Sequence, residues 1–292
     1  GADAFRVLAE AQVLKITHDG RRASGVVCRL SDGRTIEVRA KTIVVAAGAL
    51  ASSVILRRSG IGGDRVGHGL AFNIGSPIVA DMPHLVRSTE GLQITHALKF
   101  PDKPVALESW FMPLLGMSLL MPGWFGDHQR NMRRYGHLAA IGVVVGSQGN
   151  ATVKPSRLSR RAVDLDYVPT DRDRTLLLDG IRAATEIFLA AGATRVMAPT
   201  FTYTEARHPD EIDAFVASVR DDDLLINTAH PQGGNAISTN PDRGVVGNDL
   251  RVHGTDNVFV CDASVFPSSI TLNPQLTVMA LADYAVDPVA AS

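Results

Sequence analysis

The sequence is poor in cysteine, has no long apolar run and carries almost no net charge, and each shortage excludes a class of protein. Its 292 residues include 2 cysteines, Cys28 and Cys261. These are too few for a disulfide framework and lack metal-ligand spacing, so we expect two small buried apolar residues. No stretch reaches the roughly 18 apolar residues of a membrane span. Because 29 basic residues face 30 acidic ones, nucleic acid is not the expected partner.

What is present is the composition of a globular protein, with 45% apolar and 20% charged residues. This composition excludes disorder, collagen and coiled coil. The length allows about two domains of roughly 150 residues. The chain starts at Gly1 without an initiator Met, and no basic and then apolar leader follows. We therefore expect it to begin partway through a longer protein.

The first 74 residues alternate short apolar runs with turn signals. Turns at Asp19-Gly20 and Ser31-Asp32-Gly33 separate three runs and predict an antiparallel meander. The apolar run 41–48, closed by small residues, predicts a strand buried on both faces. Residues 48–56 then show helical spacing. A strand, a small-residue turn and a helix start together make a place where the backbone can approach an anionic group.

The middle of the chain, residues 75–226, has a different character. Strand-like pieces at 76–80 and 137–145 alternate with proline-rich connections. Apolar spacing then predicts a long helix at 171–191, and an acidic-capped second helix is predicted at 209–219.

The end of the chain returns to sheet-forming patterns. It is glycine-rich at 230–237, gives another doubly buried strand at 258–261 and shows helical spacing at 273–286. Two sheet-forming ends around a mixed middle predict an α/β fold of mixed α+β type. One domain, residues 1–74 and 227–292, is interrupted by a second one formed by residues 75–226.

Two segments near the C-terminus carry candidate functional side chains. His230 precedes Pro-Gln-Gly-Gly, where the missing side-chain bulk lets a planar ligand approach the main chain. A structural histidine is the alternative. Asp262 follows the strand predicted at 258–261, at the edge where open α/β sheets bind ligands. It would equally suit a cap of the next turn.

A third segment is Asn273-Pro274. Asn273 is a candidate helix N-cap with Pro274 at the first helical position, and that role alone explains both residues. The alternative role directs the free amide groups of the helix start at a developing negative charge. Such a helix start suits an electron-rich ring system.

The order and spacing of these segments resemble the C-terminal signature of the glucose-methanol-choline (GMC) flavoprotein oxidoreductases. Residues 252–267 are similar to the family segment V-x-G-x-x-N-L-x-V-x-D-A-S-x-F-P, and residues 273–282 to N-P-x-x-T-x-x-A-L-A. A second match lies at residues 48–62, which are similar to G-A-x-x-(S/T)-P-x-(L/I)-L-x-x-S-G-I-G. There Ser53 replaces the family's proline.

The resemblance implies FAD-dependent oxidation of an alcohol, with hydride passing from the carbinol carbon to flavin N5. His230 matches the base that accepts the hydroxyl proton, and Asn273 matches the second catalytic position. The electron acceptor is oxygen, a quinone or a redox protein. The residues implied to contact the cofactor are Val13, Ala47, Gly48, Asp262, Ala263, Asn273, Pro274, Gln275 and Thr277.

The resemblance also implies a βαβ unit with Gly-x-Gly-x-x-Gly for the FAD pyrophosphate. This sequence has no such motif. The run Gly60–Gly63 is typical of a helix stop and does not replace it. The FAD-binding Rossmann-like domain is therefore expected to lack its N-terminal βαβ unit, which a companion chain or an N-terminal half would supply. The alternative function is a non-catalytic GMC-like subunit that acts in assembly.

An apolar strip interrupted by prolines runs from Met112 to Phe125. It is too short to span a membrane. Core packing would explain it. The alternative is an exposed apolar lid or a docking strip for a lipid-like substrate, a quinone or a membrane surface.

Overall fold

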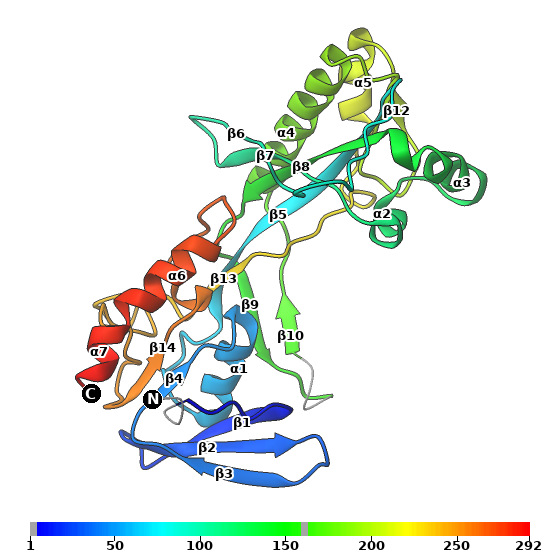
Figure 1. Ribbon diagram of the computed structural model, residues 1–292. Coiled ribbons are helices and arrows are strands. Elements are labelled where there is room, and N and C mark those ends of the chain that lie inside the picture. Colours follow the sequence, from blue (N-terminus) through cyan, green and yellow to red (C-terminus); the bar gives the residue numbers. More distant parts are fainter. Residues whose placement is uncertain (1–4, 159–162) are drawn as a thin grey trace.

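Figure 1 shows the computed structural model of the chain, which describes residues 5–158 and 163–292. The expectation that the chain begins partway through a longer protein concerns residues 1–4, which lie outside the described part. The strands form three sheets of three, nine and two strands. Within the described ranges, no helix has both the length and the apolar character that crossing a bilayer needs.

The N-terminal meander forms as predicted. Strands β1 (Ala11–His18), β2 (Ala23–Leu30) and β3 (Thr35–Arg39) pair antiparallel in sequence order. Cys28 is buried in β2, as expected, but Cys261 is only partly buried. The reason is its place directly after a short strand at a sheet edge, where its Sγ lies 4.0 Å from the carbonyl oxygen of Leu281.

A two-stranded parallel sheet pairs β4 (Ile43–Val45) with β14 (Val258–Val260). All of β14 is buried, as predicted, but β4 is not buried on both faces. Ile43 and Val45 pack into the core, whereas Val44 is 45% exposed. The prediction for β4 was wrong because the described chain leaves the face of Val44 partly uncovered. Helix α1 (Ala49–Ser59) follows β4 and ends at Gly60.

The large sheet is built around one long strand, β5 (His68–Asp81), which contains the strand predicted at 76–80. Its first half pairs with β9 (Ala151–Pro155) and β13 (Pro231–Gly234), and its second half with β8 (Leu138–Gly146) and β11 (Arg195–Met197). The outer strands are β10 (Val163–Asp166), β7 (Val105–Ser109), β6 (Ala97–Lys99) and β12 (Glu205–Ala206). Because β5 runs through residue 75, the predicted domain boundary falls inside a strand, and the division stays a prediction.

Helix α4 (Asp171–Ala190) covers this sheet (Figure 1) and confirms the predicted long helix. It begins at a capping box, in which Thr170 Oγ1 accepts from the Asp173 N–H and the Asp173 carboxylate accepts from the Thr170 N–H. At Gly180 the helix touches the sheet, since a Cβ there would lie 2.3 Å from Cγ1 of Val143. Only glycine permits this close contact.

The remaining helices are short. The helix predicted at 209–219 is a 3₁₀ turn, Pro209–Glu211, followed by α5 (Ile212–Ala217). At the chain end lie α6 (Gln275–Tyr284) and α7 (Val286–Ala290).

Part of the apolar strip at residues 112–125 packs in the core, and part of it is exposed. It forms α2 (Leu114–Leu120) and the approach to α3 (Phe125–Arg133). Met117 and Met121 are buried in a small cluster, whereas Leu115 and Phe125 are 78% and 93% exposed. Core packing therefore holds for part of the strip only.

Candidate active site

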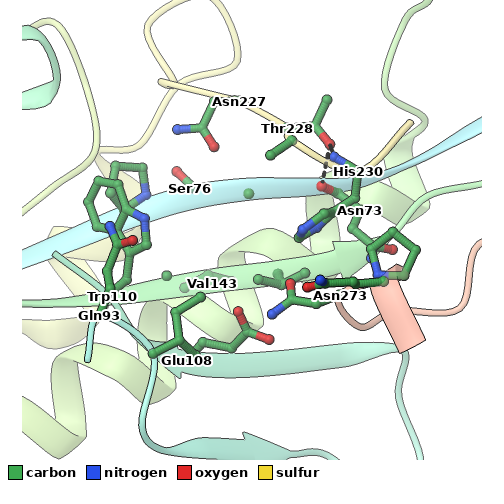
Figure 2. A pocket seen from close by; sticks show the side chains of 18 of the residues that line it. Asn73, Ser76, Gln93, Glu108, Trp110, Val143, Asn227, Thr228, His230 and Asn273 are labelled. Carbon is green, nitrogen blue, oxygen red and sulfur yellow. Dashed lines mark hydrogen bonds between the residues drawn. The ribbon is translucent and has the colours of Figure 1, made fainter. Parts of the chain in front are cut away.

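A cavity of about 680 Å³ lies between strands β5, β7 and β8 of the large sheet and the two loops that carry His230 and Asn273. Figure 2 shows both side chains at one end of this cavity, with Trp110 and Gln93 at the other. The two residues predicted to be catalytic are 43 positions apart in sequence. The fold brings them to one cavity, where they face the same space.

His230 lies directly before β13, whose pairing with β5 fixes the position of the histidine. Its N–H donates to Thr228 Oγ1 over 3.0 Å, and its carbonyl oxygen accepts from the N–H of Asn73 over 3.4 Å. The imidazole is half-buried, and this burial lowers the pKa of His230 below its ordinary value. The ring is therefore neutral at neutral pH and can accept a proton.

Asn273 does not cap the helix, contrary to the first role weighed for it. Helix α6 begins at Gln275 with Pro274 in the cap position, and no side chain caps it. The Asn273 side chain lies beside the carboxyl group of Glu108 instead. A tertiary partner thus takes the amide that the local pattern assigned to the helix start.

Glu108 is a cavity residue that the sequence reasoning missed. It lies on β7, is 6% exposed and points toward Asn273 in Figure 2. Burial raises the pKa of its carboxyl group, and the neighbouring Asn273 amide opposes part of that rise. The available signal was a lone acid in the apolar strand VALES. Asn73, buried on β5 beside the same cavity, was missed as well.

Asp262 joins the carboxyl ends of the two parallel strands. Its Oδ1 accepts from the N–H of Ser264 over 2.8 Å, which is the predicted turn cap. Its Oδ2 accepts from the N–H of Gly48 over 2.9 Å and from Ser52 Oγ over 2.5 Å. This buried carboxylate therefore fixes the turns after β4 and β14 against each other, with Ala263 beginning the second turn.

The other residues implied to contact FAD fall into two groups. Gly48 has a φ of 84°, and no atom lies within 4 Å of the position of a Cβ there, so its backbone is open to a ligand beside the exposed Ala47. The uncapped start of α6 leaves Gln275 and Thr277 exposed next to the cavity. Free N–H groups and the positive end of a helix suit an anionic or electron-rich group, so these residues fit the flavin. Val13 lies apart from them, partly buried on β1.

Helix α6 presents an apolar surface that the described chain does not cover. None of its residues is buried, and Leu276 and Met279 are 79% and 60% exposed. Met279 also lines the cavity. The uncovered apolar surface therefore begins at the cavity itself.

Two models of a family described as GMC oxidoreductase match the chain, over residues 2–76 and 146–282. An uncharacterised GMC-type oxidoreductase of Mycobacterium tuberculosis is 31% identical over 280 residues, which cover 95% of this chain and 44% of that protein. A long-chain-alcohol oxidase of Arabidopsis thaliana is 26% identical and matches 88% of this chain and 38% of its own length.

Among solved structures, the pyridoxine 4-oxidase from Mesorbium loti has the same fold. It aligns with a TM-score of 0.72 at 21% identity, over 97% of this chain and 57% of that one. The chain spans about half the length of the curated relatives it matches.

Proposed function

The chain belongs to the GMC oxidoreductase family, and on that premise we propose that it oxidises an alcohol with FAD in the cavity of His230 and Asn273. The observation that carries the proposal is the shared position of a half-buried, neutral histidine and an amide beside the uncapped start of α6. A non-catalytic subunit would need neither the cavity nor a histidine with a lowered pKa, so we favour the enzyme.

Oxidation of the alcohol removes a hydride and a proton, and different groups in the cavity accept them. Bound FAD supplies the two-electron acceptor for the hydride that leaves the carbinol carbon. Neutral His230 accepts the hydroxyl proton as the C–H electron pair departs and the C=O bond forms. Asn273 holds the same oxygen by a hydrogen bond, so that proton and hydride leave from a fixed geometry.

The flavin side of the site is assigned to residues around the two parallel strands. Gly48 and Ala47 offer open backbone, and Ala263 lies in the turn that Asp262 fixes. The backbone N–H groups of Gln275 to Thr277, at the uncapped start of α6, would stabilise the negative charge that the flavin ring gains. Val13, on β1, is assigned to the adenine end of the cofactor.

The cavity favours a neutral or cationic alcohol over an acid. Its volume of about 680 Å³ suits a small organic substrate. Among the described residues that line it, His230 and Glu108 are the ionisable ones, and no lysine or arginine is present. A carboxylate on the substrate would therefore meet Glu108 without a compensating cation. Trp110 and Val143 supply apolar contacts for the substrate body.

We also propose that a further segment carrying the Gly-x-Gly-x-x-Gly unit pairs with the free edge of β4. Among the described strands β4 pairs only with β14, and the exposed Val44 lies on this short strand. An apolar strand edge of this kind is an aggregation hazard unless another strand covers it. Residues 1–292 expressed alone should therefore tend to self-associate and lack stoichiometric FAD, and a monomer with full FAD content would refute the companion segment.

The experiment that tests the activity uses the complete flavoprotein and the variant His230→Ala. Reduction of the flavin by an alcohol, followed anaerobically by stopped-flow absorbance, should slow by at least about a hundredfold while the flavin stays bound. His253→Ala is the matched control, because that ring is also partly buried but bonds the Ser238 carbonyl oxygen outside the cavity. Equal rates for His230→Ala and the unmodified protein would reject the proposal.

A further inference from the structure

Asn73 lies at the point of β5 where its neighbours change. Phe72, the residue before it, pairs with Pro231 of β13, and Asn73 itself pairs with Gly146 of β8. Its side chain is 2% exposed and borders the cavity of His230 and Asn273. A buried amide must find partners for both its donor and its acceptor, and here the partners lie on the two loops that carry the site.

The backbone of Asn73 holds the His230 loop. Its N–H donates to the carbonyl oxygen of His230 over 3.4 Å, and its own carbonyl oxygen accepts from Thr228 Oγ1 over 2.8 Å. The same Thr228 oxygen accepts from the N–H of His230 over 3.0 Å. The histidine is therefore held by Asn73 at two points, directly and through one hydroxyl group.

The side chain of Asn73 holds the loop of Asn273. Its Nδ2 donates to the carbonyl oxygen of Leu272 over 2.5 Å, and Leu272 directly precedes Asn273. Its Oδ1 accepts from Ser269 Oγ over 2.5 Å. One residue on the central strand thus bonds both loops, although they lie 155 and 199 positions further along the chain.

We propose that Asn73 is a positioning residue, which holds His230 and Asn273 at the separation at which both reach one substrate oxygen. The proposal rests on the proposed function and extends it to a residue that touches neither proton nor hydride. Strand β5 is the most extensively paired strand of the large sheet, so it offers a rigid reference for both loops. Displacing a reacting group by about 1 Å can cost about a hundredfold in rate.

A merely structural role for Asn73 makes a different prediction, and Asn257 provides the comparison. Asn257 is also fully buried, and its side chain likewise bridges distant segments by bonding the backbone of Ala23 and Lys41. It lies outside the cavity. Substituting either asparagine removes the same kind of buried side-chain bridge, but only the Asn73 side chain holds a loop of the site, the one that carries Asn273.

The test compares Asn73→Ala with Asn257→Ala in the complete, FAD-loaded protein. For Asn73→Ala the flavin-reduction rate at saturating alcohol should fall about a hundredfold per bound flavin, with a much smaller change in KM. For Asn257→Ala the rate per bound flavin should stay within about twofold, although the protein is less stable. Asn73→Ala with an unchanged rate, or with losses that only follow folded protein as in Asn257→Ala, would overturn the proposal.

A milder variant covers the case in which Asn73→Ala does not fold. Ser269→Ala removes the partner of Asn73 Oδ1 and the acceptor of the Thr271 N–H but leaves the bond from Asn73 Nδ2 to Leu272. It should therefore loosen the Asn273 loop and slow flavin reduction about tenfold. A rate for folded Ser269→Ala equal to that of the unmodified protein would count against Asn73 as the connection.

A second measurement separates this proposal from the proposed activity. Isotope-labelled asparagine allows the side-chain NH2 signals of Asn273 to be followed by NMR without any substrate. In Asn73→Ala the side-chain bonds to Leu272 and Ser269 are lost, so the signals of Asn273 should shift or broaden. The backbone bonds of residue 73 to Thr228 and His230 remain, so the titration of His230 should change little. If no alcohol reduces the flavin, the activity fails, whereas unchanged Asn273 signals in folded Asn73→Ala defeat the positioning role alone.

Discussion

The sheet under α4 and the surface around β4 and α6 are both apolar in sequence, but only the first is buried by the chain itself. Ile78 of β5, Val143 of β8 and Ile181 of α4 are all 0% exposed. Leu276 and Met279 of α6 remain 79% and 60% exposed. An apolar pattern therefore predicts that a surface will be covered, but it does not identify the segment or ligand that covers it.

The uncovered surface borders the cavity proposed as the active site. Met279 lines the cavity together with His230 and Asn273, and α6 starts beside them. Exposed apolar surface at such a place marks a site of interaction. We infer that FAD and the segment that pairs with β4 cover it. Substitutions on α6 should therefore have different effects in the isolated chain, which is residues 1–292 alone, and in the complete protein, which also contains that segment and FAD. Substitutions on α4 should have the same effect in both.

The largest expected difference is between Ile181→Ala and Leu276→Ala. Ile181 is fully buried against the sheet, so its truncation should lower the free energy of unfolding by about 2–5 kcal/mol in either form of the protein. Leu276→Ala should change the isolated chain by less than about 0.5 kcal/mol, as exposed positions do. Urea unfolding followed by circular dichroism measures both quantities.

The same pair sharpens the comparison in the complete protein. There Leu276→Ala should become destabilising, because its side chain is then covered, and flavin should be lost more easily. If Leu276→Ala is as harmless in the complete protein as in the isolated chain, α6 is an ordinary solvent-facing helix and the inferred cover is wrong.

A smaller effect is expected where the uncovered region is held together by Asp262. Replacing this residue in Asp262→Ala leaves the N–H groups of Gly48 and Ser264 and the hydroxyl of Ser52 without their acceptor. Stability should fall by about 1–3 kcal/mol, and flavin content should fall with it. Thermal unfolding and the absorbance ratio of flavin to protein report both effects. The exposed Asp242 supplies the control Asp242→Ala, and unaltered flavin content in Asp262→Ala would contradict the role.

Local patterns were sufficient to predict much of this architecture. The meander needed only its turn residues, and α4 needed only its apolar spacing. The two proposed site residues, His230 and Asn273, were predicted from motif order, and both line one cavity. The reason is that turns, helix spacing and short motifs are encoded by neighbours in sequence.

Tertiary partners were beyond such patterns. Asn73 and Glu108 sit in ordinary strands, and their importance comes from partners such as Leu272 and Asn273, which are more than 160 positions away in the chain. The burial of β4 was overestimated for a related reason. No described segment covers the face of Val44, which is 45% exposed.

A weaker effect, visible only as pH changes, is expected from Glu108→Gln. Burial raises the pKa of Glu108 above its ordinary value of 4.5 in the folded chain. The protonated carboxyl group therefore stabilises the folded chain fully below that ordinary value, and this stabilisation is lost as the pH rises through the raised pKa. Relative to Glu108→Gln, the unmodified protein should lose stability over this window. Urea unfolding at several pH values measures the difference, and a gap that does not change with pH would show that Glu108 is not desolvated.

The smallest effect concerns the pH at which His230 loses its proton. Burial lowers its pKa below the ordinary value of 6.5. If the neutral ring is the base, as proposed, the rate of flavin reduction should rise with pH to a plateau, with a midpoint below 6.5. If FAD and the covering segment bury the site further, His230 in the complete protein should titrate lower than in the isolated chain, where NMR follows it. A midpoint above 6.5 would instead mean that an ionised Glu108 stabilises the protonated ring more than burial destabilises it, and Glu108→Gln would then lower that midpoint.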